Sequence, residues 1–547
     1  MHIAAIQRLS LLFALIFLSG AASAQPTDAA AEAPRAQRTA ESARFDILEF
    51  EIDGNTVLPD EAIERAVYPF LGEKRTADDV NAAVAALEKA YQDAGYLTVA
   101  VGIPEQAITT GVVKLEVTEG RVERLRVTGA EYTLPSRVKD AAPSLAEGEV
   151  PHFPEVQADL GRLARNPDLT VTPLLQPGRV PGSVAVELRL KDDNPFHGSV
   201  ELNNKRSADT DAGRIEASMR YDNLWQRRHS IGVTYFVSPR DREQVEVWGL
   251  NYSAPLGEGI VAAYYAKSNS NIPTQFDTTS LGTGDTAGFR YVRPLPDRGL
   301  GFIHSISVGA DYKDNDQDTL GIAGTAFSLS QPVRYWVLSG QYGITLPFES
   351  GARLRLGATL NVGSNAMNER IIDCNSVLAE QFECRRFGAR PSFFVSRFEI
   401  EGAMPFANGW VASGRIDIQR SSDPLINSEQ FSAGGFDSVR GYLESERLGD
   451  EGERVRLELA TPTRLFFDDA FGLSALLFYD WAGLRTREAF IGQDPRAALE
   501  STGLGLRMNA PSGWKLHADW AYALRDGAVG RTREGDQRLL MKLAYEF

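Results

Sequence analysis

The sequence predicts a β-dominated chain in which a C-terminal 16-stranded transmembrane β-barrel is preceded by two small α+β domains. From His197 to Phe547, segments of roughly ten residues alternate apolar and polar side chains between turns, which is the pattern of a membrane barrel. Residues 45–120 and 121–192 instead combine strands with segments of helical periodicity. The N-terminus carries an export signal.

Residues 1–24 have the pattern of a secretory signal peptide. An apolar run from Leu9 to Leu18 ends in the small residues Ala22-Ser23-Ala24, a cleavage site of the A-x-A type. The run is too short for a permanent membrane helix. Residues 25–44 are Ala-rich and polar, so we expect a linker or a short helix there. Pro34 would interrupt a longer helix.

Residues 45–120 predict the first α+β domain. A strand near Phe45–Glu51 precedes two helices, and the second opens with Thr76 as N-cap and Asp79 three residues later, a capping-box pattern. Apolar side chains then recur at helical spacing: Val80, Val84, Leu87 and Tyr91. Two strands, at 97–103 and 112–118, complete the order β-α-α-β-β.

Residues 121–192 repeat this order. A strand at Val122–Val127 precedes two helices, the second at Glu155–Ala164, and a strictly alternating strand closes the segment near Val184–Leu190. Two successive units with the same order of elements predict two domains of one fold.

Residues 193–547 predict the barrel. Apolar residues of the last strands alternate with Lys515, His517 and Asp519, so that one face suits lipid and the other a polar lumen. A soluble β-sandwich would also alternate, but it would rarely carry charges in the same phase on nearly every strand. Roughly sixteen segments fit the even strand number of bacterial barrels. We expect the long connections on the outer side: 269–283, 314–328, 363–391 and 420–453.

Charge and motif content restrict the function. A net charge of −16 argues against nucleic acid as a partner. The sequence has no catalytic motif and no nucleotide-binding loop GxxxxGK[ST], so we expect no enzyme activity, no nucleotide, no metal and no cofactor. The two cysteines, Cys374 and Cys384, share one polar stretch without a nearby histidine. In an exported chain this predicts a disulfide.

The most informative segment is the Gly-rich stretch 431–442, in which a compact backbone can present the charge of Arg440 at a loop tip. About forty residues later, an apolar strand carries a single acid, Asp480. Strict alternation places Asp480 opposite the apolar side chains of Leu477 and Tyr479. If the apolar side contacts lipid, Asp480 points into the lumen, where an arginine on an inward-folded loop can pair with it.

These motifs resemble the outer-membrane two-partner-secretion transporters, called TpsB proteins or the hemolysin/hemagglutinin secretion-activation family (ShlB/FhaC/HecB type). One match is Val439-Arg440-Gly441-Tyr442 followed by Asp480. A second is the similarity of 45–120 to the first POTRA domain of that family, carried by Gly95-Tyr96-Leu97, Pro104-Glu105-Gln106, Gly111 and Glu119-Gly120-Arg121. The terminal Phe547 also resembles the assembly signal of outer-membrane barrels.

The resemblance implies a structure for each site. Residues 45–120 and 121–192 would be periplasmic POTRA domains, and the sixth outer loop, 420–453, would fold into the barrel so that Arg440 meets Asp480 on strand thirteen. Gly441 would permit the tight tip and Tyr442 would pack on the inner wall, while Gly434 and Gly435 would let the loop turn back. The barrel assembly machinery would recognise Phe547.

The resemblance also implies a function and its partners. Such a transporter sits in outer-membrane lipid, captures one large unfolded β-helical exoprotein of the TpsA type in the periplasm, and translocates it to the cell surface without ATP. Two alternatives remain open: an insertase of the same superfamily, which would usually carry more POTRA domains, and a passive porin or uptake channel. Whether residues 25–44 plug the pore also remains open.

Overall fold

The computed structural model describes residues 44–108, 110–164, 166–208, 210–269, 272–273, 280–281, 283–296, 299, 301–315, 318–320, 328–330, 332–374, 376–489, 494–528 and 530–547. The expected signal peptide and linker lie outside these residues, except for Arg44. Within the described part of the chain, no helix is long and apolar enough to cross a membrane. The chain divides between Glu119 and Gly120 into two compact units.

The first unit is an α+β domain whose three-stranded sheet has the order β2-β5-β4, with β2 and β5 parallel. Two helices pack with this sheet, and a two-stranded sheet of β1 and β3 is added at the start of the domain. The sequence analysis merged β1 with β2 and did not predict β3. The elements are β1 Phe45–Ile47, β2 Glu49–Asp53, α2 Asp60–Val67, η1 Tyr68–Phe70, β3 Gly72–Arg75, α3 Ala77–Asp93, β4 Val99–Gly102 and β5 Val112–Glu119.

Helix α3 forms where its local sequence predicts it. Thr76 and Asp79 make the capping box, and the backbone N–H and hydroxyl of Thr76 hold the pKa of Asp79 below its usual range. Leu87 and Tyr91 are fully buried on the inner face of the helix. Burial raises the pKa of Tyr91 to about 12, so its hydroxyl stays protonated and donates to Asn55 Oδ1 at 2.6 Å.

The second unit begins with another α+β domain of the same topology. Its sheet has the order β6-β8-β7, with β6 and β8 parallel, and its apolar core includes Leu125, Val138, Leu145 and Leu188. The predicted order β-α-α-β-β implied a strand before β8, but the sequence did not give the bounds of the edge strand β7. The elements are β6 Arg121–Thr128, α4 Pro135–Asp140, η2 Pro143–Leu145, α5 Phe153–Leu163, β7 Leu169–Pro177 and β8 Ser183–Asp192.

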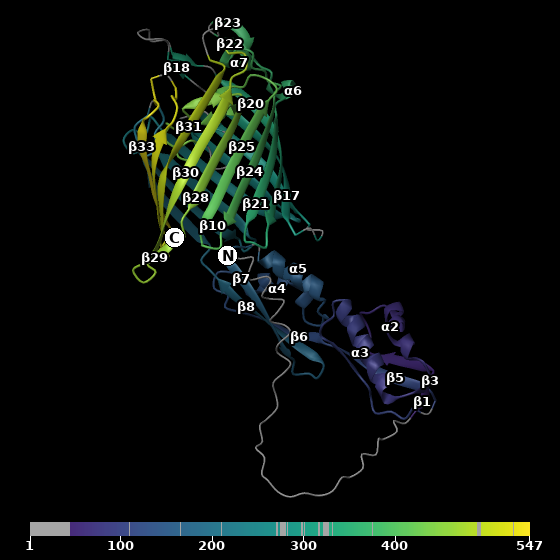
Figure 1. The fold of residues 1–547 in the computed structure, drawn as a ribbon. Helices are drawn as coiled ribbons and strands as arrows, with labels where there is room; N and C mark the ends of the chain where they lie inside the picture. The colour runs from purple at the N-terminus through teal and green to yellow at the C-terminus, as the bar shows by residue number, and fades with distance from the viewer. Residues whose placement is uncertain are drawn as a thin grey trace. The chain divides into compact units, whose positions relative to one another are not determined.

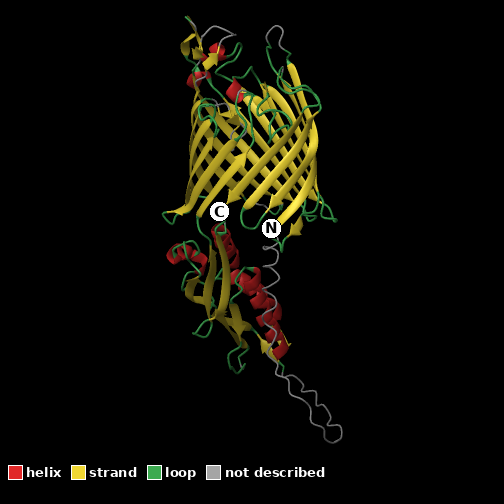
Figure 2. Ribbon diagram, turned by 90° about the vertical axis from the view of Figure 1, so that its left-hand side faces the viewer, coloured by secondary structure: helices red, strands yellow, loops and turns green. Residues whose placement is uncertain are grey.

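The rest of the second unit is a closed antiparallel barrel (Figure 1, Figure 2). The short strand β29 (Arg464–Phe466) pairs with the base of β30, while β28 and β30 pair directly. The wall therefore has sixteen strands, which confirms the predicted fold class. They are β9 Phe196–Asn203, β10 Arg214–Leu224, β11 His229–Val237, β12 Glu246–Leu256, β13 Gly259–Ser268, β16 Gly284–Leu295, β17 Ile303–Asn315, β20 Val333–Pro347, β21 Arg353–Val362, β24 Phe394–Pro405, β25 Val411–Ser421, β28 Glu451–Ala460, β30 Phe471–Arg485, β31 Arg496–Asn509, β32 Trp514–Ala523 and β33 Gln537–Glu546.

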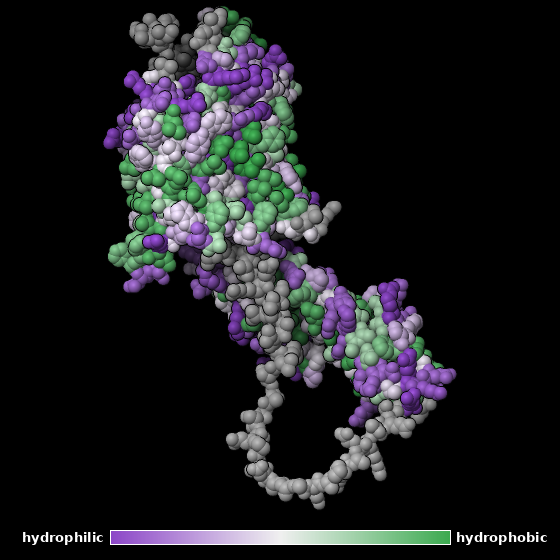
Figure 3. Space-filling view, viewed as in Figure 1, coloured by the Kyte–Doolittle hydropathy of each residue, from purple (hydrophilic) through white to green (hydrophobic). Residues whose placement is uncertain are grey.

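Alternate residues of each strand face opposite sides of the wall. On β30, Leu477 is 53% exposed, whereas its neighbours Leu476 and Phe478 are 6% and 1% exposed. On the face of the barrel drawn in Figure 3, hydrophobic side chains form a broad band over the strands, and hydrophilic side chains gather toward the end with the long connections. An outward apolar band around an inward polar face is the arrangement that a lipid bilayer requires.

Connections at the two ends of the barrel differ in length. The end at which β8 leads into β9 has the short turns, and the opposite end has the long connections, including 363–393 (loop 5) and 422–450 (loop 6). The long connections carry small elements of their own: β14 Ile272–Pro273, β15 Ser280–Leu281, β18 Asp318–Leu320, β19 Ser328–Ser330, α6 Asn365–Asn368, β22 Ile371–Cys374, β23 Val377–Glu380, α7 Gln381–Arg385, η3 Asn427–Glu429, β26 Phe431–Ala433 and β27 Arg447–Gly449.

Candidate functional site

Loop 6 forms a hairpin that folds back against the inner wall. Its neck is the antiparallel pair β26–β27, and its tip lies between these strands. Gly434, Gly435 and Gly441 have φ values of 109°, 107° and 93°, a region that side chains with a Cβ rarely adopt. A Cβ on Gly434 would lie 2.4 Å from the carbonyl oxygen of Leu443. These glycines therefore permit the compact tip.

The structure brings Arg440 and Asp480 together. Arg440 Nε donates to Asp480 Oδ2 at 2.6 Å, Nη2 donates to Oδ1 at 2.7 Å, and the backbone N–H of Arg440 donates to Oδ2 at 3.1 Å. Both residues are 0% exposed. The guanidinium also lies over the ring of Phe478, 3.5 Å from its centroid. The pair therefore combines bidentate hydrogen bonding with a cation–π contact.

Two further acids lie beside Arg440, and the sequence had not assigned them to the site. Arg440 Nη1 lies 2.8 Å from Glu458 Oε1 and 3.4 Å from Asp519 Oδ2. Asp519 is in turn bound by Arg507 Nη2 at 2.9 Å. The alternation around Asp519 marked that acid as inward-facing, but it did not show which of the many inward charges the loop would contact.

The neighbours of Arg440 in the motif are also buried. Val439 and Tyr442 are 0% and 1% exposed and pack in an apolar cluster with Leu499 and Ala523 of the wall. The Tyr442 hydroxyl lies 2.7 Å from the carbonyl oxygen of Arg525 and 2.9 Å from that of Glu500, and its single proton can be donated to either. The tip is thus fixed by charge at Arg440 and by packing on either side of it.

A second set of buried charges holds the base of loop 6. Asp450 is 0% exposed and binds Arg386 of loop 5, with Nη2 to Oδ2 at 2.7 Å. Glu429, also 0% exposed, accepts from Lys313 Nζ at 2.6 Å and from the Tyr335 hydroxyl at 2.8 Å. Sequence reasoning missed this set because its members come from two connections, loops 5 and 6, and from two strands, β17 and β20.

Cys374 and Cys384 form a disulfide in loop 5, joining the end of β22 to helix α7. Helix α7 also carries the buried Phe382, which packs against Tyr335 with ring centroids 5.3 Å apart. The disulfide therefore lies beside the segment from which Arg386 reaches loop 6.

Phe547 lies at the seam that closes the barrel. Its backbone N–H donates to Gly198 O at 3.0 Å and its carbonyl accepts from Gly198 N at 2.9 Å. Its ring covers Gly198, where a Cβ would lie 2.3 Å from the ring. Tyr545 and Phe196 have ring centroids 5.9 and 6.1 Å from that of Phe547. A small residue at position 198 thus accommodates the last side chain of the chain.

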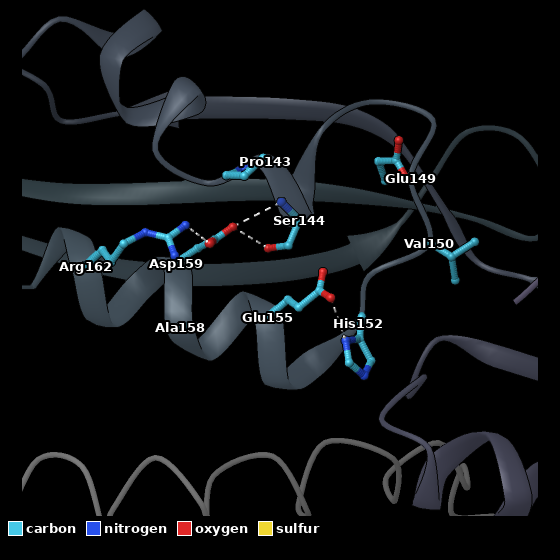
Figure 4. Close-up of a pocket in the computed structure, with 9 residues that line it drawn as sticks. All are labelled: Pro143, Ser144, Glu149, Val150, His152, Glu155, Ala158, Asp159 and Arg162. Carbon is cyan, nitrogen blue, oxygen red and sulfur yellow. Dashed lines mark hydrogen bonds and ion pairs between the residues drawn. The ribbon is translucent and has the colours of Figure 1, made fainter. Parts of the chain in front are cut away.

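A pocket of about 360 Å³ lies in the second α+β domain, between η2, α5 and the loop that joins them (Figure 4). Asp159 is buried at its wall and accepts from the backbone N–H and hydroxyl of Ser144 at 3.0 and 2.7 Å. His152 Nδ1 lies 3.3 Å from Glu155 Oε1 at its rim. The pocket combines apolar wall with paired polar groups, and the sequence analysis did not predict it.

Comparison with known families matches two separate parts of the chain. The model "POTRA domain, ShlB-type" matches residues 45–120. The model "Haemolysin secretion/activation protein ShlB/FhaC/HecB" matches residues 363–508, the part of the chain that contains loop 5, loop 6 and Asp480.

Individual relatives agree with this assignment. The outer membrane transporter CdiB of Dickeya dadantii (strain 3937) is 23% identical over 432 residues, covering 76% of this chain and 72% of the relative. The structure of CdiB from Escherichia coli superposes with a TM-score of 0.62 at 19% identity, covering 94% of this chain and 93% of that one. BamA from Haemophilus ducreyi lacking POTRA domains 1–3 shares the fold, with a TM-score of 0.53 at 14% identity, covering 92% of this chain and 100% of that one.

The matched domains and the barrel show in which compartment each part of the protein lies. The barrel spans the outer membrane, and the POTRA domains of this family are periplasmic. The short-turn end, at which the second domain leads into β9, is therefore the periplasmic end, and loops 5 and 6 are extracellular. The chain belongs to the TpsB family, the two-partner-secretion transporters of the outer membrane, with POTRA domains followed by a sixteen-stranded barrel.

Proposed function

We propose that this transporter exports one large, unfolded β-helical exoprotein of the TpsA type. The POTRA domains, which we assign to residues 45–120 and 121–192, capture the partner in the periplasm. The barrel, residues 193–547, then passes it to the cell surface without ATP, and folding outside draws the chain through.

One observation carries the proposal: charged groups and small packing contacts, rather than strand pairing with the wall, hold loop 6 at Arg440. Asp480, Glu458 and Asp519 all approach Arg440 from the wall. A loop fixed in this way can leave the lumen as a unit once its charged groups interact with water or with polar groups of the exported chain in place of the wall. We therefore assign Arg440 and Asp480 as a lock on the path of the exported chain.

The periplasmic domains offer two capture surfaces. Strands β2 and β4 are the edges of the first sheet, and β6 and β7 are the edges of the second. An unfolded β-prone chain can add to such an edge through main-chain hydrogen bonds, which demand little sequence. The pocket lined by Ser144, His152 and Asp159 would add side-chain selection.

Energy for this export would come from the partner. The sequence has no loop of the form GxxxxGK[ST] that could cradle a nucleotide. A chain that folds into a β-helix outside the cell cannot slide back, so folding outside biases the direction of movement.

The direct test is secretion by the intact host. Deleting the gene should abolish the appearance of the large β-rich exoprotein encoded next to it in the medium or on the cell surface, and plasmid-borne protein should restore it. Undiminished secretion in the deletion strain would refute the proposal.

Insertion of other barrels into the membrane is a second candidate. The strand register of the seam between β33 and β9 has five pairs, from Lys542↔Asn203 to Glu546↔Ser199, and Phe547 adds two backbone hydrogen bonds to Gly198. Each other junction between wall strands pairs at least eight residues in the described registers. A seam with few backbone hydrogen bonds can open and expose a strand edge, and a strand of another protein can pair with that edge. Loss of several unrelated outer-membrane proteins in the deletion strain, with normal exoprotein secretion, would favour this candidate.

A further inference from the structure

Three potential metal ligands meet where the second POTRA domain adjoins the first barrel hairpin. Asp168 directly precedes β7, His197 is the second residue of β9, and Asp222 lies near the end of β10. One ligand atom from each residue lies within 4.8 Å of the others. His197 Nε2 is 2.9 Å from Asp168 Oδ1 and 3.7 Å from Asp222 Oδ2. None of these residues takes part in the contacts of loop 6.

The backbone fixes all three positions. His197 pairs with Arg220 in the β9–β10 ladder, and the backbone N–H of Asp222 donates to Pro195 O at 2.8 Å. The N–H of Asp168 donates to Asn166 Oδ1 at 3.1 Å. The three side chains therefore converge from rigid segments, as a preformed site requires.

The hydrogen bonds within the cluster leave one carboxylate oxygen of Asp168 without a partner among the described residues. The residue is 6% exposed, and its Oδ2 atom has no hydrogen-bond partner among the described residues. A buried carboxylate oxygen without a partner is costly and calls for an explanation. A proton on His197 would strengthen its contacts with Asp168 Oδ1 and Asp222 but would leave Asp168 Oδ2 unpartnered.

A metal ion bound through both carboxylate oxygens of Asp168 accounts for the arrangement better, because it also gives Oδ2 a partner. One imidazole nitrogen and the oxygens of two carboxylates are a donor set suited to zinc and related ions. Ligand atoms about 2.0–2.2 Å from a tetrahedral ion lie roughly 3.3 Å from one another. The two observed separations from His197 Nε2, 2.9 and 3.7 Å, bracket that value.

Arg220 is a positively charged neighbour that opposes a cation here. Its Nε donates to Asp222 Oδ2 at 2.8 Å, and its side chain is 50% exposed. Arg220 therefore competes with an ion for one oxygen of Asp222. Removal of the Arg220 side chain should therefore increase the affinity of the cluster for an ion.

We propose that Asp168, His197 and Asp222 bind a divalent transition-metal ion of the zinc type. Because Asp168 belongs to the second POTRA domain while His197 and Asp222 belong to the first two barrel strands, the ion fastens that domain to the barrel. The site is structural, and it is independent of the route of the exported chain.

The test uses the full-length protein in detergent, stripped with a chelator and titrated with zinc. We expect one zinc per chain, and a four-coordinate absorption spectrum when cobalt(II) replaces it. Asp168→Asn and His197→Gln should each weaken zinc binding at least about 10-fold. His304→Gln, which removes a barrel histidine outside the cluster, should leave binding unchanged.

Arg220→Gln provides a variant that gains rather than loses affinity. Its half-exposed side chain can be replaced without opening the core, and zinc should bind more tightly once Asp222 is free. Heat-modifiable migration on gels checks that each variant is a folded barrel. The proposal is overturned if the native protein binds no stoichiometric zinc, if His197→Gln binds zinc as the native protein does, or if Arg220→Gln weakens binding.

Discussion

Arg440 on loop 6 binds both carboxylate oxygens of Asp480 on the thirteenth barrel strand, at 2.6 and 2.7 Å, and neither side chain is exposed. Removing one partner leaves the other charge buried with weaker compensation, which costs about 3–5 kcal/mol in typical buried pairs. Glu458 and Asp519 remain 2.8 and 3.4 Å from Arg440 after loss of Asp480, whereas Arg456 remains 3.7 Å from Asp480 after loss of Arg440. Asp480→Ala should therefore lie at the lower end of that range and Arg440→Ala at the upper end.

The first prediction is therefore a strongly non-additive double-mutant cycle. Arg440→Ala, Asp480→Ala and the double variant should each give folded barrels with reduced secretion and increased protease cleavage in loop 6. The double variant should be no worse than Arg440→Ala. Arg485→Ala is the matched control, because this half-exposed arginine on the same strand touches Glu451 only at 3.7 Å. If the loss of secretion in the double variant equals the sum of the losses in the two single variants, the two residues act separately.

A second prediction concerns the backbone of the loop. Gly434→Ala forces a Cβ to within 2.4 Å of a carbonyl oxygen at a φ of 109°. We expect the tip to shift and loop 6 to become protease-sensitive, with secretion reduced as in Arg440→Ala. Gly340→Ala is the control, since a Cβ there meets no atom within 4 Å. If the two alanine variants show the same secretion and the same protease sensitivity of loop 6, the tip tolerates the added Cβ.

Sequence reasoning was most successful where periodicity carries the information. Strict alternation on β30 predicted that Asp480 faces away from Leu477, and helical spacing predicted the buried face of α3. It failed for β3, which has only four residues, and it did not give the bounds of β7, whose sequence lacks strict alternation. It also could not identify Asp519 or Asp450 as partners, because burial of a charge depends on which loop folds over it, and that is decided by tertiary packing.

The third prediction is that the disulfide between Cys374 and Cys384 is dispensable for transport. The closed loop is short, with a sequence separation of 10, so by the chain-entropy model the disulfide contributes at most about 2–3 kcal/mol. The barrel ladder and the contacts of Phe382 and Arg386 remain without it. A variant with Ser at both positions should assemble and secrete normally. Normal assembly with lost secretion would show that the loop itself takes part in transport.

The fourth prediction tests the pocket in the second POTRA domain. Ala158 lines the pocket and is exposed on α5, so Ala158→Trp should fill the pocket without disturbing the core beneath it. We expect reduced secretion with unchanged barrel assembly. Gln157→Trp places the same side chain on the neighbouring exposed position, which is not part of the pocket lining. If both tryptophans reduce secretion equally, the pocket has no specific part in capture.

The fifth prediction separates assembly from stability at Phe547. The ring covers Gly198 and has Tyr545 and Phe196 as aromatic neighbours, and aromatic pairs of this kind contribute about 0.5–1.5 kcal/mol each. Phe547→Ala keeps both backbone hydrogen bonds to Gly198, so the finished barrel should lose little thermal stability. If the barrel assembly machinery recognises the terminal side chain, the yield of heat-modifiable barrel in the outer membrane should nevertheless fall several-fold. Phe466→Ala controls for loss of an exposed aromatic ring at the periplasmic end and should leave the yield unchanged. A normal yield of Phe547→Ala would exclude the assembly role, and a yield that falls only in step with the melting temperature would assign the ring to stability alone.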